Sequence, residues 1–246
     1  MSKTLKTLFA AAALAATTLA SATPIVGIAN LTIGQVIVRN GSVDWNNDPT
    51  NIDPPPNGAN ITTGDFRVIN TRTGSFLTGT PQLSLGTIRD MADPAILPGD
   101  TGNAFPLGTV TNVHNFLTFA AQPNWIFDAT YLVPGYLGIS PFVLTQQGTN
   151  VGVTMTIYGT ACDDLNLSGT CNAGDDITKW TGIFSAQFTN TTVAEIAATI
   201  LGGGALGNNT WSATIEATAL PEPTSVALVG LALAGVGFVS RRRQAK

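Results

Sequence analysis

Three segments of the chain alternate apolar and polar residues with a period of two, and this pattern constrains the fold more than any other feature. The segments are residues 151–158, 180–188 and 211–218. Such alternation is typical of a strand with one buried and one exposed face. Between the chain ends, Thr, Gly, Asn and Pro are frequent while Lys and Glu are scarce, which disfavours long surface helices. The sequence therefore predicts an all-β domain.

Weaker strand patterns fill much of the remaining chain, each bounded by Gly, Pro, Asn or Asp. They are Ile33 to Arg39, Phe66 to Asn70, Leu83 to Ile88, Val110 to Phe119, Trp125 to Val133 and Pro141 to Thr145. About nine strands in one domain predict an antiparallel two-sheet β-sandwich, jelly-roll or immunoglobulin-like in outline. One short helix should interrupt the strands, because Thr192 and Glu195 form a capping box and Gly202 to Gly204 end the segment. Consecutive prolines make Asn46 to Asn60 a loop.

The N-terminal residues have the pattern of a secretory signal peptide. Lys3 and Lys6 precede an apolar run from Leu8 to Leu19, and Ala20-Ser21-Ala22 fits a cleavage site. Cleavage between Ala22 and Thr23 would start the mature protein at Thr23. A retained membrane anchor is the rival interpretation, but the apolar run is short for a bilayer span.

The C-terminal residues combine three elements in a fixed order. Pro221-Glu222-Pro223 precedes an apolar run from Val226 to Val239, and Arg241-Arg242-Arg243 follows it. Together they resemble the PEP-CTERM sorting signal. The resemblance implies an apolar sorting helix, an exosortase-type membrane protease as partner, recognition through Pro221, Glu222 and Pro223, and a stop-transfer role for the three arginines. It also implies an exported protein, often associated with exopolysaccharide. An ordinary tail anchor is the alternative.

These two ends divide the chain into a signal peptide (1–22), a β-sandwich domain (23–220) and a sorting tail (221–246). The domain holds five of the 11 basic residues and 14 of the 15 acidic ones, a net charge of −9. Such a surface repels phosphate backbones, which excludes nucleic acid as a partner and favours divalent cations or neutral sugars. We expect the protein in the inner membrane transiently and then at the cell surface or outside the cell.

The two cysteines, Cys162 and Cys171, are expected to form a disulfide. Export would place them in an oxidising compartment, where neighbouring thiols pair. Closure of so short a loop stabilises a fold by about 2 to 3 kcal/mol. Two independent free thiols are the alternative.

The acidic residues around these cysteines have the spacing of a calcium-binding loop. Counting Asp164 as position 1, oxygen-bearing residues occupy positions 1, 3, 5, 7, 9 and 12: Asp164, Asn166, Ser168, the carbonyl of Thr170, Asn172 and Asp175. The spacing resembles the loops of EF-hands and dockerin-type repeats. Ser168 is a weak ligand, Asp175 replaces the usual Glu, and no helix precedes the loop. A structural calcium ion and a simple turn-rich loop therefore both stay open, and no other cofactor is expected.

The sequence predicts no catalytic residues and hence no enzyme. Its single histidine, His114, lacks an accompanying G-x-S-x-G motif. The mature domain has only Glu195 and Glu216 as glutamates, and Glu195 is used by the helix cap. A polysaccharide hydrolase built on Asp163, Asp164, Asp175 and Asp176 is the least favoured alternative.

Four tryptophans suggest a carbohydrate-binding role because sugars stack on exposed aromatic rings. Trp180 and Trp211 fall on apolar strand faces and are assigned to the core, whereas Trp45 and Trp125 border loops and are candidate ligand residues. The leading hypothesis is a structural or interaction protein of the cell envelope or extracellular matrix, which contacts exopolysaccharide or other polymers. A dedicated carbohydrate-binding module is the second hypothesis.

Overall fold

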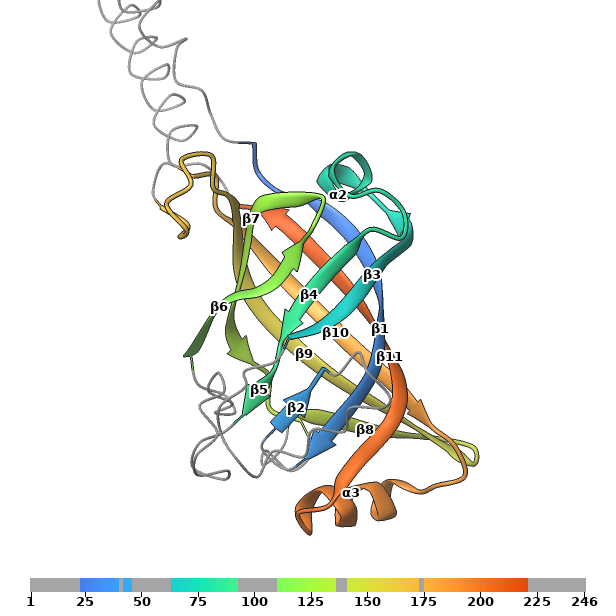
Figure 1. Cartoon of the computed structure of the whole chain (residues 1–246). Coiled ribbons are helices and arrows are strands. Elements are labelled where there is room, and N and C mark those ends of the chain that lie inside the picture. Colours follow the sequence, from blue (N-terminus) through green and yellow to red (C-terminus); the bar gives the residue numbers. More distant parts are fainter. Residues whose placement is uncertain are drawn as a thin grey trace, which may run out of the picture.

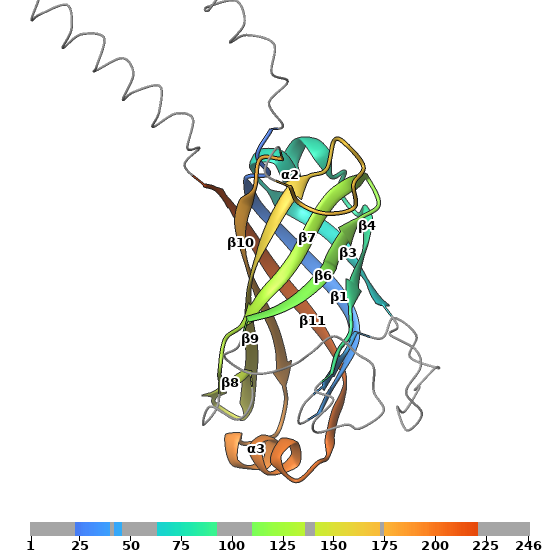
Figure 2. The ribbon, with the colours of Figure 1, turned by 90° about the vertical axis from the view of Figure 1, so that its left-hand side faces the viewer.

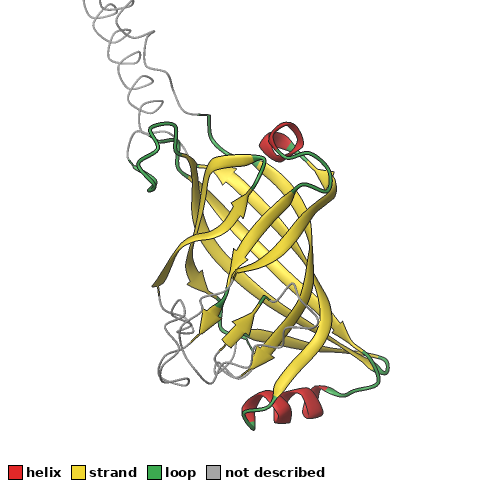
Figure 3. Cartoon of the chain, viewed as in Figure 1, coloured by secondary structure: helices red, strands yellow, loops and turns green. Residues whose placement is uncertain are grey.

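A computed structural model describes residues 23–39, 42–45, 63–92, 110–135, 141–172 and 175–220 of the 246-residue chain. This part is mostly β-structure with two short helices (Figures 1 and 3). The predicted loop at Asn46 to Asn60 lies outside it. The elements in chain order are β1 (Gly27–Arg39), β2 (Ser42–Asp44), β3 (Thr63–Arg72), α2 (Gly74–Gly79), β4 (Leu85–Arg89), β5 (Met91–Ala92), β6 (Val110–Phe119), β7 (Gln122–Leu132), β8 (Phe142–Gln147), β9 (Asn150–Asp163), β10 (Thr178–Phe188), α3 (Val193–Leu201) and β11 (Ala205–Ala219).

Eight strands form a closed antiparallel ring. Its order is β1, β11, β10, β9, β7, β6, β4 and β3, and β3 pairs with β1 again. The other strands extend the ring locally: β2 pairs with β1, β5 with β2 and β8 with β9. The predicted two-sheet sandwich is therefore wrong, because the chain folds as a β-barrel (Figure 1).

The ladder between the first and last strands closes the barrel. It runs from the pair Gly27 and Ala217 to the pair Arg39 and Ala205, with register shifts near Ile33 and Val36. At 15 residues, β11 is long enough to pair with β10 on one side and β1 on the other. A sandwich would leave β1 and β11 as sheet edges, whereas closure satisfies the backbone hydrogen bonds along both.

The strongest alternating segments of the sequence are confirmed as β9, β10 and β11, with the predicted face inside. On β9 the side chains of Val151, Val153, Met155 and Ile157 have no exposed surface. The corresponding buried face of β10 and β11 carries Trp180, Phe184, Trp211, Ala213, Ile215 and Ala217. The weaker strand patterns are also strands, although β1 begins six residues before the predicted segment at Ile33.

Aromatic rings fill the barrel interior along its length. Each ring contacts the next, with centroids 5.2 to 6.4 Å apart. Such aromatic pairs contribute about 0.5 to 1.5 kcal/mol each beyond the burial of their surface. In order, the rings are Phe76, Trp125, Phe127, Trp180, Phe116, Phe184, Trp45, Trp211 and Phe142.

Inward-facing glycines make room for these rings. A Cβ at Gly159 would lie 2.0 Å from the carbonyl oxygen of Asp128 and 2.2 Å from Nε1 of Trp180. The indole N–H of Trp180 donates to the carbonyl oxygens of Asp128 and Thr160, at 3.0 and 3.1 Å. At Gly86, a Cβ would lie 2.2 Å from the ring of Phe66. Rings placed directly against bare backbone allow the sheet to curve tightly, as a small barrel requires.

The predicted helix is confirmed as α3, which lies across one end of the barrel (Figure 2). The capping box is complete, because the N–H of Glu195 donates to Oγ1 of Thr192 and the N–H of Thr192 donates to Oε2 of Glu195. Ile196 and Ile200 are buried against the barrel core. The helix thus covers the apolar interior at this end.

The described chain begins before β1 and ends after β11 at the opposite end of the barrel, which carries α2 (Figures 1 and 2). There the residues before β1 are held by the segment around α2: the N–H of Ser75 donates to the carbonyl of Val26 at 2.7 Å. Gly27, at φ 119°, and Gly74, at φ 57°, pass so closely that a Cβ on either would lie 2.2 Å from a carbonyl oxygen. We call this the tether end of the barrel.

Replacing Gly159 by alanine tests the role of the inward glycines. We expect Gly159→Ala to lower the free energy of unfolding by about 1 to 3 kcal/mol or more, because the new methyl group collides with backbone and with Trp180. Gly207→Ala is the matched control, since its Cβ meets only Ile37 at 3.9 Å. For Gly207→Ala, urea denaturation should show a free energy of unfolding that is unchanged or higher by at most about 1 kcal/mol. Equal losses in the two variants would contradict the interpretation.

Candidate functional site

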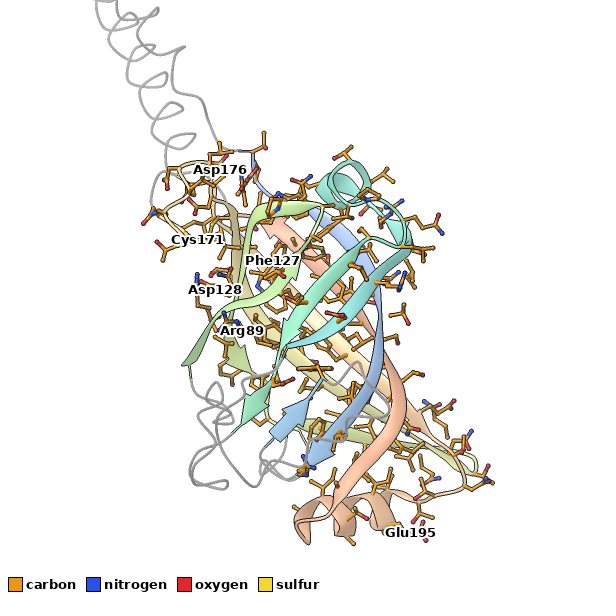
Figure 4. All side chains as sticks on the ribbon, in the orientation of Figure 1. Arg89, Phe127, Asp128, Cys171, Asp176 and Glu195 are labelled. Carbon is orange, nitrogen blue, oxygen red and sulfur yellow. A yellow bond between two sulfur atoms is a disulfide. The ribbon has the colours of Figure 1, made fainter. Side chains whose placement is uncertain are left out.

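His114 braces an irregular stretch of β6. Its Nδ1 lies 2.9 Å from Oδ1 of Asp128, and its Nε2 lies 3.0 Å from Nδ2 of Asn115. The N–H of Asn115, a residue with φ of 51°, donates to the same Asp128 oxygen at 2.8 Å. Asp128 projects from the side of the barrel (Figure 4). The cluster sits where the pairing of β6 with β7 shifts register, which supports a structural role for this histidine.

The loop between β9 and β10 is closed by a disulfide, as predicted from the sequence. Cys162, at the end of β9, is bonded to Cys171 with a Cα to Cα distance of 5.7 Å. The N–H of Asp164 donates to the carbonyl of Asn124, which fixes the loop to the start of β7. The loop, with Cys171 and Asp176, projects at the tether end (Figure 4).

Four of the six predicted calcium ligands converge on a fifth, Ser168. Its N–H donates to Oδ1 of Asn166 at 2.9 Å, and its Oγ lies 3.2 Å from Oδ1 of Asp164 and 2.9 Å from the carbonyl oxygen of Thr170. Nδ2 of Asn172 lies 2.6 Å from the same Oγ. The sixth residue, Asp175, instead accepts the N–H of Asn172 at 2.8 Å.

These hydrogen bonds can hold the loop in its conformation without a metal ion. In the described ranges, no three side chains of His, Cys, Asp or Glu come together as a metal site. Any calcium ion would depend largely on uncharged oxygens, which bind it more weakly than carboxylates do. The calcium site therefore stays a prediction, beside the turn-forming role that these residues have.

The neighbouring carboxyl groups Asp163 and Asp164 have pKa values shifted in opposite directions. Burial by itself would raise the pKa of Asp164, but the N–H groups of Gly169 and Ser168 and the Ser168 hydroxyl hold it below the usual 3.8. Burial raises the pKa of Asp163, and the negative charges of Asp164 and Asp175 raise it further. The loop thus uses the Asp164 carboxylate as an internal cap, while Asp163 carries an electrostatic cost. Asp164 and Asp175 are both buried.

The prediction that Trp45 and Trp125 present rings to a sugar is wrong for this fold. Their exposed fractions are 0% and 6%. Trp45 packs against Phe184 and Trp211, and Trp125 packs against rings at the other end of the core. Barrel closure turns both indoles inward, although the flanking residues are loop-like in sequence.

An aromatic pair on the outer surface, Tyr131 and Tyr158, was missed. The two residues pair across β7 and β9, and their rings stack with centroids 6.2 Å apart and planes 26° apart. Tyr158 is 44% exposed. The signal was present in the sequence, because Tyr158 falls on the polar side of the alternation in β9.

Hydroxyl side chains extend from this pair to one side, across the outside of β9, β10, β11 and β1. The strand registers place them in rows, one of which crosses four strands from Thr154 through Ser185 and Ser212 to Thr32. Neighbouring rows lie about 7 Å apart and neighbouring strands about 5 Å apart. We call this surface the hydroxyl face: Thr32, Thr154, Thr156, Thr160, Thr181, Ser185, Ser212, Thr214 and Thr218, with Tyr131 and Tyr158 at its border.

Beyond the last barrel strand the sequence changes character at once. Residues 219–243 match the family model of the PEP-CTERM protein-sorting motif. The chain carries a PEP-CTERM sorting motif. It is therefore an exported protein that is sorted to the envelope and processed by an exosortase-type system. Pro221, Glu222, Pro223 and the arginines at 241 to 243 lie inside the matched segment, and their separate roles stay predictions, as does cleavage between Ala22 and Thr23.

The PEP-CTERM motif covers only the tail, so the barrel has to be interpreted from its own residues. No curated protein and no solved structure matches the chain. Among the helices of the described ranges, none has the length and apolar character needed to cross a membrane. The sorting tail lies outside those ranges.

Replacing Asp164 tests its role as the loop cap. Because its pKa is lower in the folded than in the unfolded protein, its stabilising effect is present above pH 3.8 and is lost as the pH falls through the folded value. We expect Asp164→Asn to destabilise the protein at pH 7 and to flatten its stability profile below pH 3.8. Asp163→Asn, which removes a group with a raised pKa, should have the opposite effect at pH 7. Denaturation at several pH values measures both, and a loss in both variants would contradict the assignment.

Calcium titration tests the predicted metal loop. If the loop binds calcium, the melting temperature of the EDTA-treated protein should rise when millimolar calcium is added, because a ligand of the folded state stabilises it. Equal magnesium should have less effect, and Asp164→Asn should abolish the calcium-dependent shift. A melting temperature that calcium leaves unchanged would eliminate the metal site.

Proposed function

We propose that this protein is a non-enzymatic surface protein, which the sorting system delivers to the envelope and whose hydroxyl face binds neutral polysaccharide of the extracellular matrix. The observation that carries the proposal is the stacked pair at the border of this face, in which Tyr158 is exposed and Tyr131 is half-buried. In this proposal the tyrosine pair, in place of the buried tryptophans, is the aromatic surface on which a sugar ring packs. The delivery step follows from the sorting motif.

The chemistry of the face matches a neutral glycan. The C–H side of a sugar ring packs on an aromatic face, and its hydroxyls exchange hydrogen bonds with protein hydroxyls. Ile183, 48% exposed, adds apolar surface on the strand next to Tyr158. Some of these hydroxyls are held in fixed positions across strands: Ser185 bonds to Ser212 at 3.2 Å, and Thr214 donates to Oδ1 of Asn30 at 2.7 Å.

The face carries few charges, which favours a neutral partner. Lys179 and Glu216 lie on it with opposite signs. The wider domain is strongly acidic and would repel polyanionic polymers at long range. A neutral chain avoids this repulsion.

The non-enzymatic part of the proposal rests on what the acidic residues do. Asp164 and Asp175 of the hydrolase hypothesis accept hydrogen bonds from their own loop. His114 and Asp128 hold the irregular stretch of β6. These groups have structural uses that explain their presence without catalysis.

Delivery includes, in this proposal, a step in which the apolar run from Val226 to Val239 is inserted in the inner membrane. One residue, Ser240, separates the run from three arginines, which hold the C-terminus in the cytoplasm. The barrel is then on the far side of the membrane until the tail is processed.

Affinity electrophoresis in gels containing a neutral polysaccharide tests the binding surface. We expect the wild-type mobility to fall as the polysaccharide concentration rises. Tyr158→Ala should weaken binding roughly twofold to tenfold, which corresponds to about 0.5 to 1.4 kcal/mol for one lost aromatic contact. Tyr158→Phe keeps the ring and should bind like wild type. Leu201→Ala is the control, because Leu201 is an exposed residue of α3 and lies outside the hydroxyl face. An unretarded wild-type protein in a panel of neutral polysaccharides would overturn the proposal.

A further inference from the structure

Exposed leucines gather at the tether end of the barrel. Of the ten large apolar side chains exposed in the described ranges, six belong to segments at this end. Hydrogen bonds join these segments: the side-chain amide of Gln122 donates to the carbonyl of Gly79, and the N–H of Asp164 donates to the carbonyl of Asn124. The six are Leu77, Leu83, Leu85, Leu165, Leu167 and Leu220.

Two of these leucines occupy backbone positions that leucine disfavours. Leu83 has φ of 63° and Leu167 has φ of 55°, in the left-handed region. The other described non-glycine residues with positive φ are Asn115 and Asn190, and asparagine tolerates this conformation. For leucine it costs about 1 to 2 kcal/mol. Burial does not offset this cost, because Leu83 is 54% and Leu167 72% exposed.

The chain connection keeps this end close to the tail. The sorting motif begins at residue 219, the last residue of β11, so no spacer separates the barrel from it. Val226, where the apolar run starts, is six residues beyond Leu220. Six residues span at most about 22 Å when fully extended. While the run is in a bilayer, the tether end must therefore lie near the bilayer surface.

We infer that the exposed leucines of the tether end contact the phospholipid surface while the tail is embedded. The inference rests on the membrane step of the proposed function. The leucines enter the interface between headgroups and acyl chains, where the transfer of apolar side chains out of water is favourable. Asp163, the last residue of β9, and Asp176, shortly before β10, flank the segment that carries Leu165 and Leu167, and their negative charge disfavours anionic headgroups. The contact is therefore apolar and suits zwitterionic lipid.

A tryptophan probe tests the contact directly. The chain from Thr23 to Lys246 is reconstituted into phosphatidylcholine vesicles with and without brominated acyl chains, and flotation measures tail insertion separately. The native tryptophans are buried, so the emission added by a new one can be followed. In Leu167→Trp we expect this emission to shift to the blue and to be quenched by brominated lipid. In Leu201→Trp, at the opposite end, we expect neither change.

The outcomes separate the contact from the tail. Protein that floats with vesicles while the Leu167→Trp probe is not quenched overturns the contact and leaves tail insertion standing. Protein that does not float overturns both, because nothing then holds the end at the bilayer. A blue shift that appears without vesicles as the protein concentration rises would mean that the leucines join two copies, which also overturns the contact with lipid.

The two leucines with left-handed backbone give a second test, which separates membrane contact from a role in stabilising the fold. In the double variant Leu83→Asn and Leu167→Asn, relief of the backbone strain should raise the melting temperature. The same variant should show weaker protection of the tether end from a soluble protease on phosphatidylcholine vesicles. Anionic phosphatidylglycerol vesicles should protect the wild type less than phosphatidylcholine vesicles. A lower melting temperature, or unchanged protection, would overturn the inference.

Discussion

The pairing of β1 with β11 is the contact on which the rest of the structure depends. It joins the two ends of the folded chain along most of the length of both strands and converts an open sheet into a ring. Without it, β1 and β11 would expose unpaired backbone groups, and the aromatic rings of the interior would be open to solvent on one side. Because the pairing links residues that are far apart in sequence, it depends on every strand between them being in register.

Period-two patterning predicted the strands and the inner faces of β9, β10 and β11, because alternation depends only on each strand having one buried side. The same patterning could not distinguish a closed barrel from two stacked sheets, since both bury one face. The inward glycines held a clue: Gly159 and Gly182 interrupt otherwise large inner faces, where the rings of Trp180 and Phe184 need space. Their meaning depends on neighbours across the sheet, which sequence alone does not supply.

The site residues divide in the same way. The disulfide and the capping box of α3 are local and were predictable. The burial of Trp45 and Trp125 is a property of the closed ring, so residues next to loops became core. Tyr158 was visible on the polar side of its strand, but its stacking on Tyr131 requires the pairing of β7 with β9. The left-handed backbone of Leu83 and Leu167 has no signature in residue type, because leucine is rarely chosen for such turns.

The position of β11 determines how the barrel responds to mechanical load. The sorting tail continues directly from the end of this strand, and β11 is hydrogen-bonded to β10 on one side and β1 on the other. A pull on the tail therefore acts along the strand, so that two ladders resist together in shear instead of opening one bond at a time. A domain held at an envelope surface by its C-terminus would keep its shape under drag from the surrounding fluid.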